Sequence, residues 1–151
     1  GEKTVLADLT FGIEKEEIDE KLLSDVIEKS QLKSLIDSLT NKLDTIIGDR
    51  GARLSGGEKQ RIGIARALYN KPKVIVFDEA TSSLDIYNEN KILKEIYDNK
   101  KDKTLIIISH RNNTVKYCDL IYVMEDGKII DNGTFEQIMK KHSYLKENVV
   151  T

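Results

Sequence analysis

The stretch L-S-G-G-E-K-Q at residues 54–60 opens a segment whose apolar residues recur at helical spacing, so it predicts the start of a helix. Ser55 and Glu58 have the spacing of a capping box, in which each side chain bonds the backbone N–H of the other. Gly56 and Gly57 lack a Cβ, which lets another molecule approach the N–H groups at the positive end of the helix dipole. Such an end binds anions, phosphate above all. Taken alone, such a stretch is more often an ordinary helix start with loop glycines. The rest of the chain must therefore decide between that interpretation and a phosphate-binding site.

Two apolar runs that end in polar side chains follow. Residues 74–77 lead into Asp78 and Glu79, and residues 104–108 lead towards His110. Continuous runs rich in β-branched residues predict parallel strands buried on both faces. In open α/β sheets, ligands bind at the carboxyl ends of the strands. We therefore expect these three polar side chains to converge with the glycine-headed helix.

These motifs together resemble the nucleotide-binding domain of ATP-binding cassette (ABC) transporters of the exporter type. Residues 54–60 resemble the signature loop, 74–79 the Walker B strand, 82–85 the D-loop and His110 the switch histidine. The match is collinear over nearly all of the chain. It implies an α/β fold, namely an incomplete RecA-like P-loop NTPase core with an α-helical signature subdomain.

Composition agrees with a single soluble α/β domain, since the 151 residues are 39% apolar and 33% charged. The net charge of −2 gives no reason to expect nucleic-acid binding. The single cysteine, Cys118, cannot form an internal disulfide, and we expect a buried structural thiol in a reducing compartment. No apolar stretch has the length needed to span a bilayer, so any membrane link must come through another segment or subunit.

The resemblance also divides the chain. Residues 1–12 are the lead-in that follows the glutamine-bearing loop, and they open without a strand of their own. Residues 13–70 form the helical subdomain with the signature motif, which receives a coupling helix from the transmembrane part. Residues 71–151 form the C-terminal part of the RecA-like core. Asp8 stands where the family commonly has asparagine, and Asp49 where glutamate is usual.

Spacing and turn residues predict the remaining elements. Helices are expected within residues 14–30 and 32–39, a loop at 41–53, the signature helix to about Tyr69, a strand pair at 119–124 and 127–131, and a capped helix over 134–141. Asp85 is expected to cap a helix whose core face contains Ile92, Leu93, Ile96 and Tyr97.

One family motif is missing from the sequence. The chain nowhere contains G-x-x-x-x-G-K-[ST], the Walker A loop that holds the β- and γ-phosphates. In the family this loop comes before every motif found here, so the chain resembles the C-terminal part of a cassette. Removing the loop's strand would leave unpaired sheet edges. We expect the chain by itself to aggregate, to swap segments or to need the missing N-terminal Walker A segment, and to be inactive.

By the resemblance, catalysis of ATP hydrolysis falls to Glu79 and His110. Asp78 would hold Mg²⁺ through water, Glu79 would polarise the attacking water, and His110 would bond and sense the γ-phosphate. In phosphoryl transfer, positioning and charge neutralisation supply most of the rate enhancement.

The resemblance implies that ATP is shared between two nucleotide-binding domains. The residues expected to contact the partner-held nucleotide are Ser55, Gly56, Gly57 and Glu58. Asp85 would both cap its helix and reach the partner. The dimer would couple ATP hydrolysis to export through a transmembrane domain or subunit, placing the chain peripherally on the cytoplasmic face of the cell (inner) membrane.

Two other interpretations stay open. The head lobe of chromosome-maintenance and DNA-repair ABC ATPases also accommodates Glu58, although no coiled-coil heptads precede Gly12 and residues 78–85 follow the exporter pattern. The other interpretation is a non-catalytic fragment that only binds a partner.

Overall fold

The structure is a computed structural model that describes residues 3–11, 13–48, 51–98 and 103–142. In chain order its elements are β1 (Lys3–Thr4), α1 (Val5–Thr10), η1 (Lys15–Glu17), α2 (Glu20–Lys29), α3 (Lys33–Ser38), η2 (Lys42–Asp44), β2 (Ile46–Ile47), α4 (Gly56–Tyr69), β3 (Val74–Asp78), α5 (Ile86–Asp98), β4 (Thr104–Ile108), α6 (Asn112–Val115), β5 (Ile121–Glu125), β6 (Lys128–Gly133) and α7 (Phe135–Lys141).

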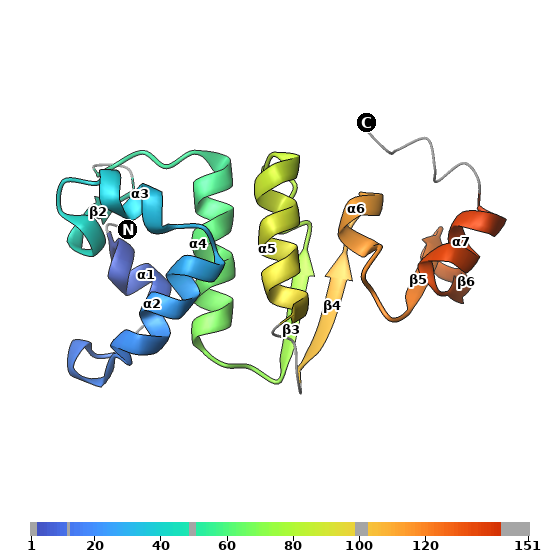
Figure 1. The fold of residues 1–151 in the computed structure, drawn as a ribbon, viewed down its shortest axis with the longest axis horizontal. Coiled ribbons are helices and arrows are strands. Elements are labelled where there is room, and N and C mark those ends of the chain that lie inside the picture. Colours follow the sequence, from blue (N-terminus) through green and yellow to red (C-terminus); the bar gives the residue numbers. More distant parts are fainter. Residues whose placement is uncertain (1–2, 12, 49–50, 99–102, 143–151) are drawn as a thin grey trace. The chain divides into compact units, whose positions relative to one another are not determined.

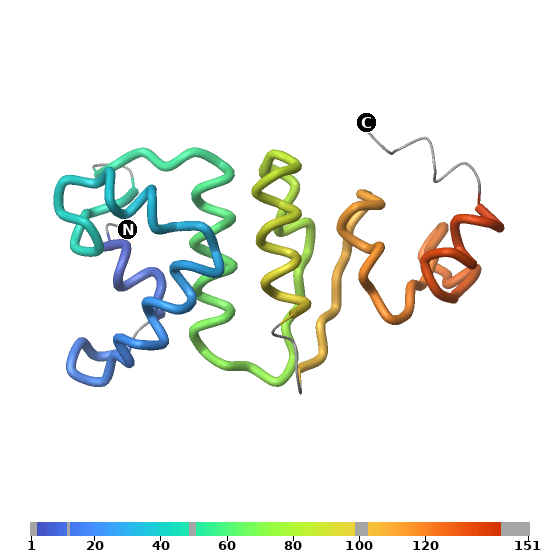
Figure 2. The backbone as a smooth tube through the Cα atoms, viewed as in Figure 1, coloured from blue at the N-terminus to red at the C-terminus, as the bar shows by residue number. Residues whose placement is uncertain are grey.

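The chain forms two compact units, Gly1–Ile106 and Ile107–Thr151. Figure 2 traces the backbone through both of them. The predicted positions Gly12 and Asp49 lie outside the described residues. None of the described helices is long and apolar enough to cross a membrane.

The core of the first unit forms around α4. Figure 1 shows α4 beside the group of short helices α1–α3, and α1 and α2 both contact it. The buried cluster consists of Val5, Leu9, Leu23, Val26, Leu32, Ile36, Ile47, Ile62, Ala65 and Tyr69. The Tyr69 hydroxyl accepts a hydrogen bond of 3.0 Å from the backbone N–H of Asp19, which ties the end of α4 to the start of α2. Ile62, Ala65 and Tyr69 recur at helical spacing along α4 and lie on its buried face.

Helix α2 is shorter than the sequence pattern indicates. The side chain of Asp19 accepts from the backbone N–H of Leu22 and caps the helix, so α2 begins at Glu20. The preceding residues Lys15–Glu17 form a 3₁₀ turn instead. Leu23 and Val26 are buried, as the helical spacing predicts.

The lead-in contains a strand, which corrects the prediction that it has none. Lys3 and Thr4 pair antiparallel with Ile47 and Ile46, so the predicted loop at 41–53 also carries a short strand. The Thr4 side chain then accepts from the N–H of Ala7 at 3.1 Å and starts α1. Two residues are too short a strand to show period-2 alternation, so the sequence pattern missed it.

Strand β3 is buried on one face only, so the prediction of burial on both faces is wrong. Ile75 and Phe77 are 3% and 6% exposed, whereas Val74 and Val76 are 52% and 57% exposed. Strand β3 lies in a two-stranded sheet with β4. An apolar run shows that both faces of a strand can be buried. In the described part of the chain, only one face of β3 is covered.

The second unit contains the predicted hairpin and capped helix. Strands β5 and β6 pair antiparallel from Ile121↔Gly133 to Glu125↔Lys128. Asp126 and Gly127 make the turn with φ of 48° and 73°, the left-handed region that tight hairpins use. Helix α7 packs on the hairpin behind the predicted capping box. Cys118, expected to be buried, is half-buried.

An acid-dependent contact ties β6 to the end of α7. Asp131 lies 2.9 Å from His142 Nε2 and 3.0 Å from Lys141 Nζ. The hydrogen bond from His142, then that from Lys141, lowers the pKa of Asp131 from 3.8 to about 2. A lowered carboxyl pKa stabilises the fold above the unfolded-state value, and this contribution is lost as the pH falls through the folded-state value.

We expect Asp131→Asn to lower the melting temperature of the β6–α7 region above about pH 4, with the difference from wild type shrinking as the pH falls to about 2 and vanishing below it. Amide NMR signals of β6 and α7, followed during heating, measure this. Asp126→Asn is the control because Asn also tolerates the left-handed turn. A difference that persists unchanged to pH 2 would contradict the ion-pair explanation.

Candidate functional site

The start of α4 has the predicted capping box. Ser55 Oγ accepts from the N–H of Glu58 at 3.3 Å, and Glu58 Oε2 accepts from the Ser55 N–H at 2.7 Å. The Ser55 hydroxyl also donates to Glu58 Oε2 at 2.9 Å. Gly56 and Gly57 are therefore the first residues of the helix. Their N–H groups have no carbonyl partner within the helix, which is the arrangement that anions bind.

The glycines also make room for a loop of the same chain. A Cβ on Gly57 would lie 3.1 Å from the backbone oxygen of Ser83 and 3.3 Å from Leu84 Cδ2. A Cβ on Gly56 would lie 3.4 Å from the Ser83 side chain. From the sequence, the glycines are explained either by an approaching ligand or by an ordinary loop before a helix. The structure adds an internal reason, because the loop after β3 packs against this turn of α4.

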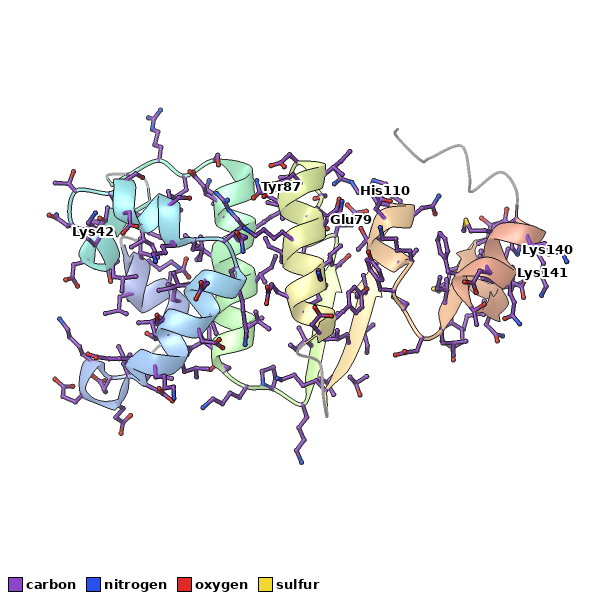
Figure 3. The ribbon with its side chains drawn as sticks, viewed as in Figure 1. Lys42, Glu79, Tyr87, His110, Lys140 and Lys141 are labelled. Carbon is purple, nitrogen blue, oxygen red and sulfur yellow. The ribbon has the colours of Figure 1, made fainter. Side chains whose placement is uncertain are left out.

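That loop begins with the two predicted carboxylates. Asp78 is the last residue of β3, and both Asp78 and Glu79 are exposed. Glu79 has a φ of 45°, a left-handed conformation that costs a non-glycine residue roughly 1–2 kcal/mol. Its carbonyl accepts from the N–H of Ser82 at 3.0 Å, which closes a turn. Figure 3 shows Glu79 at the end of β3.

Helix α5 holds the loop from one side. Thr81 Oγ1 donates to Glu89 Oε1 at 2.8 Å, and Glu89 is 1% exposed. Asp85 caps the helix, as predicted: Oδ1 accepts from the N–H of Asn88 at 3.0 Å and Oδ2 from its side-chain amide at 2.6 Å. The bond from the Asn88 N–H is the main reason that the pKa of Asp85 lies below its ordinary value.

Helix α4 holds the loop from another side through Gln60. Its Nε2 donates to Ser82 Oγ at 3.0 Å and to the Glu79 carbonyl at 3.3 Å, and its Oε1 accepts from the Ser83 N–H at 2.9 Å. The sequence motif includes Gln60, but nothing in its spacing predicts that it bonds this loop.

Asp8, which departs from the family pattern, has cationic partners. Its Oδ1 lies 2.6 Å from Lys3 Nζ and 2.8 Å from Arg66 Nη1, and its side chain is 13% exposed. A carboxylate at this position therefore joins α1 to α4 by an ion pair that an asparagine side chain would lack.

His110 follows β4 in the second unit and is exposed. The adjacent Ser109 Oγ accepts from the N–H of Arg111 at 3.0 Å and shapes the turn. The unit division separates His110 from Asp78 and Glu79, so the convergence of all three side chains stays a prediction.

The two carboxylates at the end of β3 fit a magnesium ion that nucleotide phosphates help to hold. Among the described residues, no group of three or more acidic, His or Cys side chains could bind a metal ion by itself. Mg²⁺ in phosphate-binding sites is commonly held by one or two carboxylates with substrate phosphates and water. Asp78 meets that requirement because it is the last residue of β3 and its side chain is exposed.

A family profile described as ABC transporter matches residues 3–82, a span that includes the capped α4, β3 and the first residues of the loop after β3. The chain belongs to the ABC transporter family. Its fold is that of a P-loop NTPase, and the resemblance found in the sequence is confirmed.

Similar proteins come from bacteria and fungi. The alpha-hemolysin translocation ATP-binding protein HlyB of Escherichia coli is 47% identical over 114 residues, which cover 73% of this chain and 16% of HlyB. The ABC multidrug transporter mdr1 of Aspergillus fumigatus is 36% identical over 146 residues, which cover 97% of this chain and 11% of mdr1. Exporter-type ATP-binding proteins are thus its relatives, and the chain spans a small part of each.

A solved structure of a bacterial Atm1-family ABC exporter with ATP bound is also similar. The TM-score is 0.85 with 28% sequence identity, and the match covers 98% of this chain and 26% of the solved chain. The chain therefore has the fold of this exporter's matched part, as its motifs predict.

Two of the three glycines of α4, Gly57 and Gly63, differ in a testable way. We expect Gly57→Ala to destabilise the chain, because the new Cβ would press on the Ser83 carbonyl at 3.1 Å. Gly63→Ala is the matched control: the nearest atom, at 4.0 Å, is the flexible end of Arg66, so the substitution should raise the free energy of unfolding by roughly 0.5–1 kcal/mol. Thermal or urea unfolding measures both. Equal gains in stability would show that the loop does not press on Gly57.

Proposed function

We propose that this chain is part of the ATP-hydrolysing domain of an ABC exporter, in which ATP-driven dimerisation and hydrolysis are coupled to transport. One observation carries the proposal. The capped, glycine-headed start of α4 is packed and hydrogen-bonded against the loop that presents Asp78 and Glu79. A phosphate-binding helix end and a carboxylate pair thus lie on two adjoining segments of one unit.

Each polar residue has a distinct role in this proposal. Glu79 orients and polarises the water that attacks the γ-phosphate. Asp78 holds Mg²⁺ through water, and the ion neutralises charge on the phosphate oxygens. His110 donates a hydrogen bond to the γ-phosphate and senses its presence.

The helix start acts on the nucleotide of a second copy or a related domain. The residues that contact the γ-phosphate there are Ser55, Gly56, Gly57 and Glu58. Asp85, exposed at the start of α5, reaches the same partner while it caps its helix. ATP bound between the domains holds them together, and hydrolysis releases them.

Two further partners complete the domain. The segment that carries the phosphate-binding Walker A loop would pack on the exposed apolar face formed by Val74 and Val76. A transmembrane domain or subunit places the assembly on the cytoplasmic face of the cell (inner) membrane, where it acts as a peripheral ATPase. The exporter-type relatives favour this assignment over a chromosome-maintenance ATPase.

The full-length protein that contains these residues should hydrolyse ATP in the presence of magnesium, whereas the 151-residue chain alone should not. Glu79→Gln should lower kcat by roughly 10²–10⁴-fold, the usual contribution of a positioned base, while ATP binding persists. Phosphate release and nucleotide binding measure the two effects. Glu95→Gln is the control because it neutralises a carboxylate on the neighbouring α5.

Two results would contradict the proposal. One is full turnover by the Glu79→Gln variant. The other is magnesium-dependent hydrolysis by the purified chain without a Walker A segment. Turnover that appears only on mixing the chain with a segment carrying that loop would support a complementing half-site.

The carboxylate of Glu58 lies at the proposed phosphate site, so its charge is testable. Glu58→Gln keeps the capping box, since Gln serves equally well there, but removes a negative charge. We expect a loss of stability of no more than about 1 kcal/mol, because the negative charge at the positive helix end is removed. The KM for magnesium-ATP should be lower by roughly two- to fivefold, the size of a screened surface charge pair. Glu58→Ala is the comparison, since it removes the charge and also the bond to the Ser55 N–H, and should lower the melting temperature. A KM raised by Glu58→Gln would show that the carboxylate helps to bind nucleotide.

A further inference from the structure

We propose that Gln60 is a positioning residue for hydrolysis, holding the backbone of Glu79 and of the following turn against the start of α4. The inference rests on the proposed function of Glu79 as the residue that orients water. It concerns a side chain outside the group assigned to nucleotide, metal or catalysis above.

The bonds of Gln60 fix the orientation of its amide. The Ser83 N–H can only donate and the Glu79 carbonyl can only accept, so Oε1 must face Ser83 and Nε2 must face Glu79. Nε2 also meets Ser82 Oγ at 3.0 Å. One planar amide therefore bonds residues at both ends of the turn that follows β3.

The bonded atoms are the ones that determine where the Glu79 side chain points. The Glu79 carbonyl accepts both from Gln60 at 3.3 Å and from the Ser82 N–H at 3.0 Å. Together these bonds favour the left-handed conformation of Glu79, with a φ of 45°. A residue other than glycine keeps a left-handed backbone conformation only where several surrounding contacts hold it there. If the amide is lost, Glu79 is freer to relax and its carboxylate leaves its position.

The same amide links this conformation to the phosphate-binding helix start. Gln60 is on the first turns of α4, directly after the segment whose glycines pack on Ser83. A displacement of the helix start is thus transmitted to the Glu79 backbone through hydrogen bonds and direct packing. Thr81, bonded to the buried Glu89, holds the middle of the turn on α5.

The test is steady-state ATP hydrolysis by the full-length protein carrying Gln60→Met, which keeps the length of the side chain and removes its hydrogen bonds. We expect kcat to fall roughly tenfold to a hundredfold, as misplacement of a reacting group does, with KM for magnesium-ATP changed by less than about twofold. In a Glu79→Gln background the same substitution should cause no further loss of turnover. Gln137→Met is the matched control: it removes an amide that bonds the Thr134 N–H at the start of α7, and it should leave kcat unchanged.

A second measurement separates this proposal from the proposed function. Hydrogen–deuterium exchange of the peptide covering residues 79–84 should become faster in Gln60→Met and stay unchanged in Gln137→Met. Absence of turnover in the wild type would refute the proposed ATPase function, while exchange would still show whether Gln60 holds the turn. Three results would each overturn the positioning role. They are an unchanged exchange rate of the 79–84 peptide in Gln60→Met, a change in KM as large as that in kcat, and a further loss of turnover when Gln60→Met is added to Glu79→Gln.

Discussion

The close approach of the α4 start to the loop after β3 is the constraint on which the site depends. A Cβ on Gly57 would stand 3.1 Å from the Ser83 carbonyl oxygen, so this position has little room for a side chain. Because the loop lies so close to Gly57, the start of α4 must be capped by small or neighbouring side chains. Ser55 and Glu58 provide this cap locally, since each bonds the backbone N–H of the other. The site therefore combines a self-contained helix cap with a tightly packed loop.

The loop can hold an unfavourable backbone conformation because contacts from two helices fix it. Gln60 bonds its two ends from α4, and Glu89 bonds Thr81 from α5. The exposed bonds of Gln60 to Glu79 and Ser83 each contribute about 0.5–1.5 kcal/mol, and loss of one partner of the buried Thr81–Glu89 bond costs about 1–3 kcal/mol. That cost is comparable to the left-handed strain at Glu79 of roughly 1–2 kcal/mol. The hydrogen bonds are thus strong enough to keep the carboxylate-bearing residue where it lies.

Sequence spacing predicted the features that neighbouring residues determine. The capping boxes at Ser55 and Thr134, the cap at Asp85 and the turn at Asp126 each depend on residues within a few positions. Contacts between distant segments were missed. The ion pair of Asp8 with Arg66 joins positions 58 apart, and no periodicity encodes it. The prediction that β3 is buried on both faces was wrong for a related reason. The exposure of a strand depends on which segments cover it and not on the strand's own composition.

The capping box also shows how the start of α4 provides hydrogen-bond partners for its own backbone. Glu58 places an anion at the positive end of α4, and the Ser55 hydroxyl donates to that carboxylate at 2.9 Å. A phosphate arriving at the glycine N–H groups would meet this charge and would compete for the same hydroxyl hydrogen. Exchanging one charged acceptor for another changes the free energy little, whereas the repulsion between the two anions opposes binding. A glutamate at this position therefore stabilises the isolated helix, and under the proposed function its charge would weaken the binding of ATP at the same helix end.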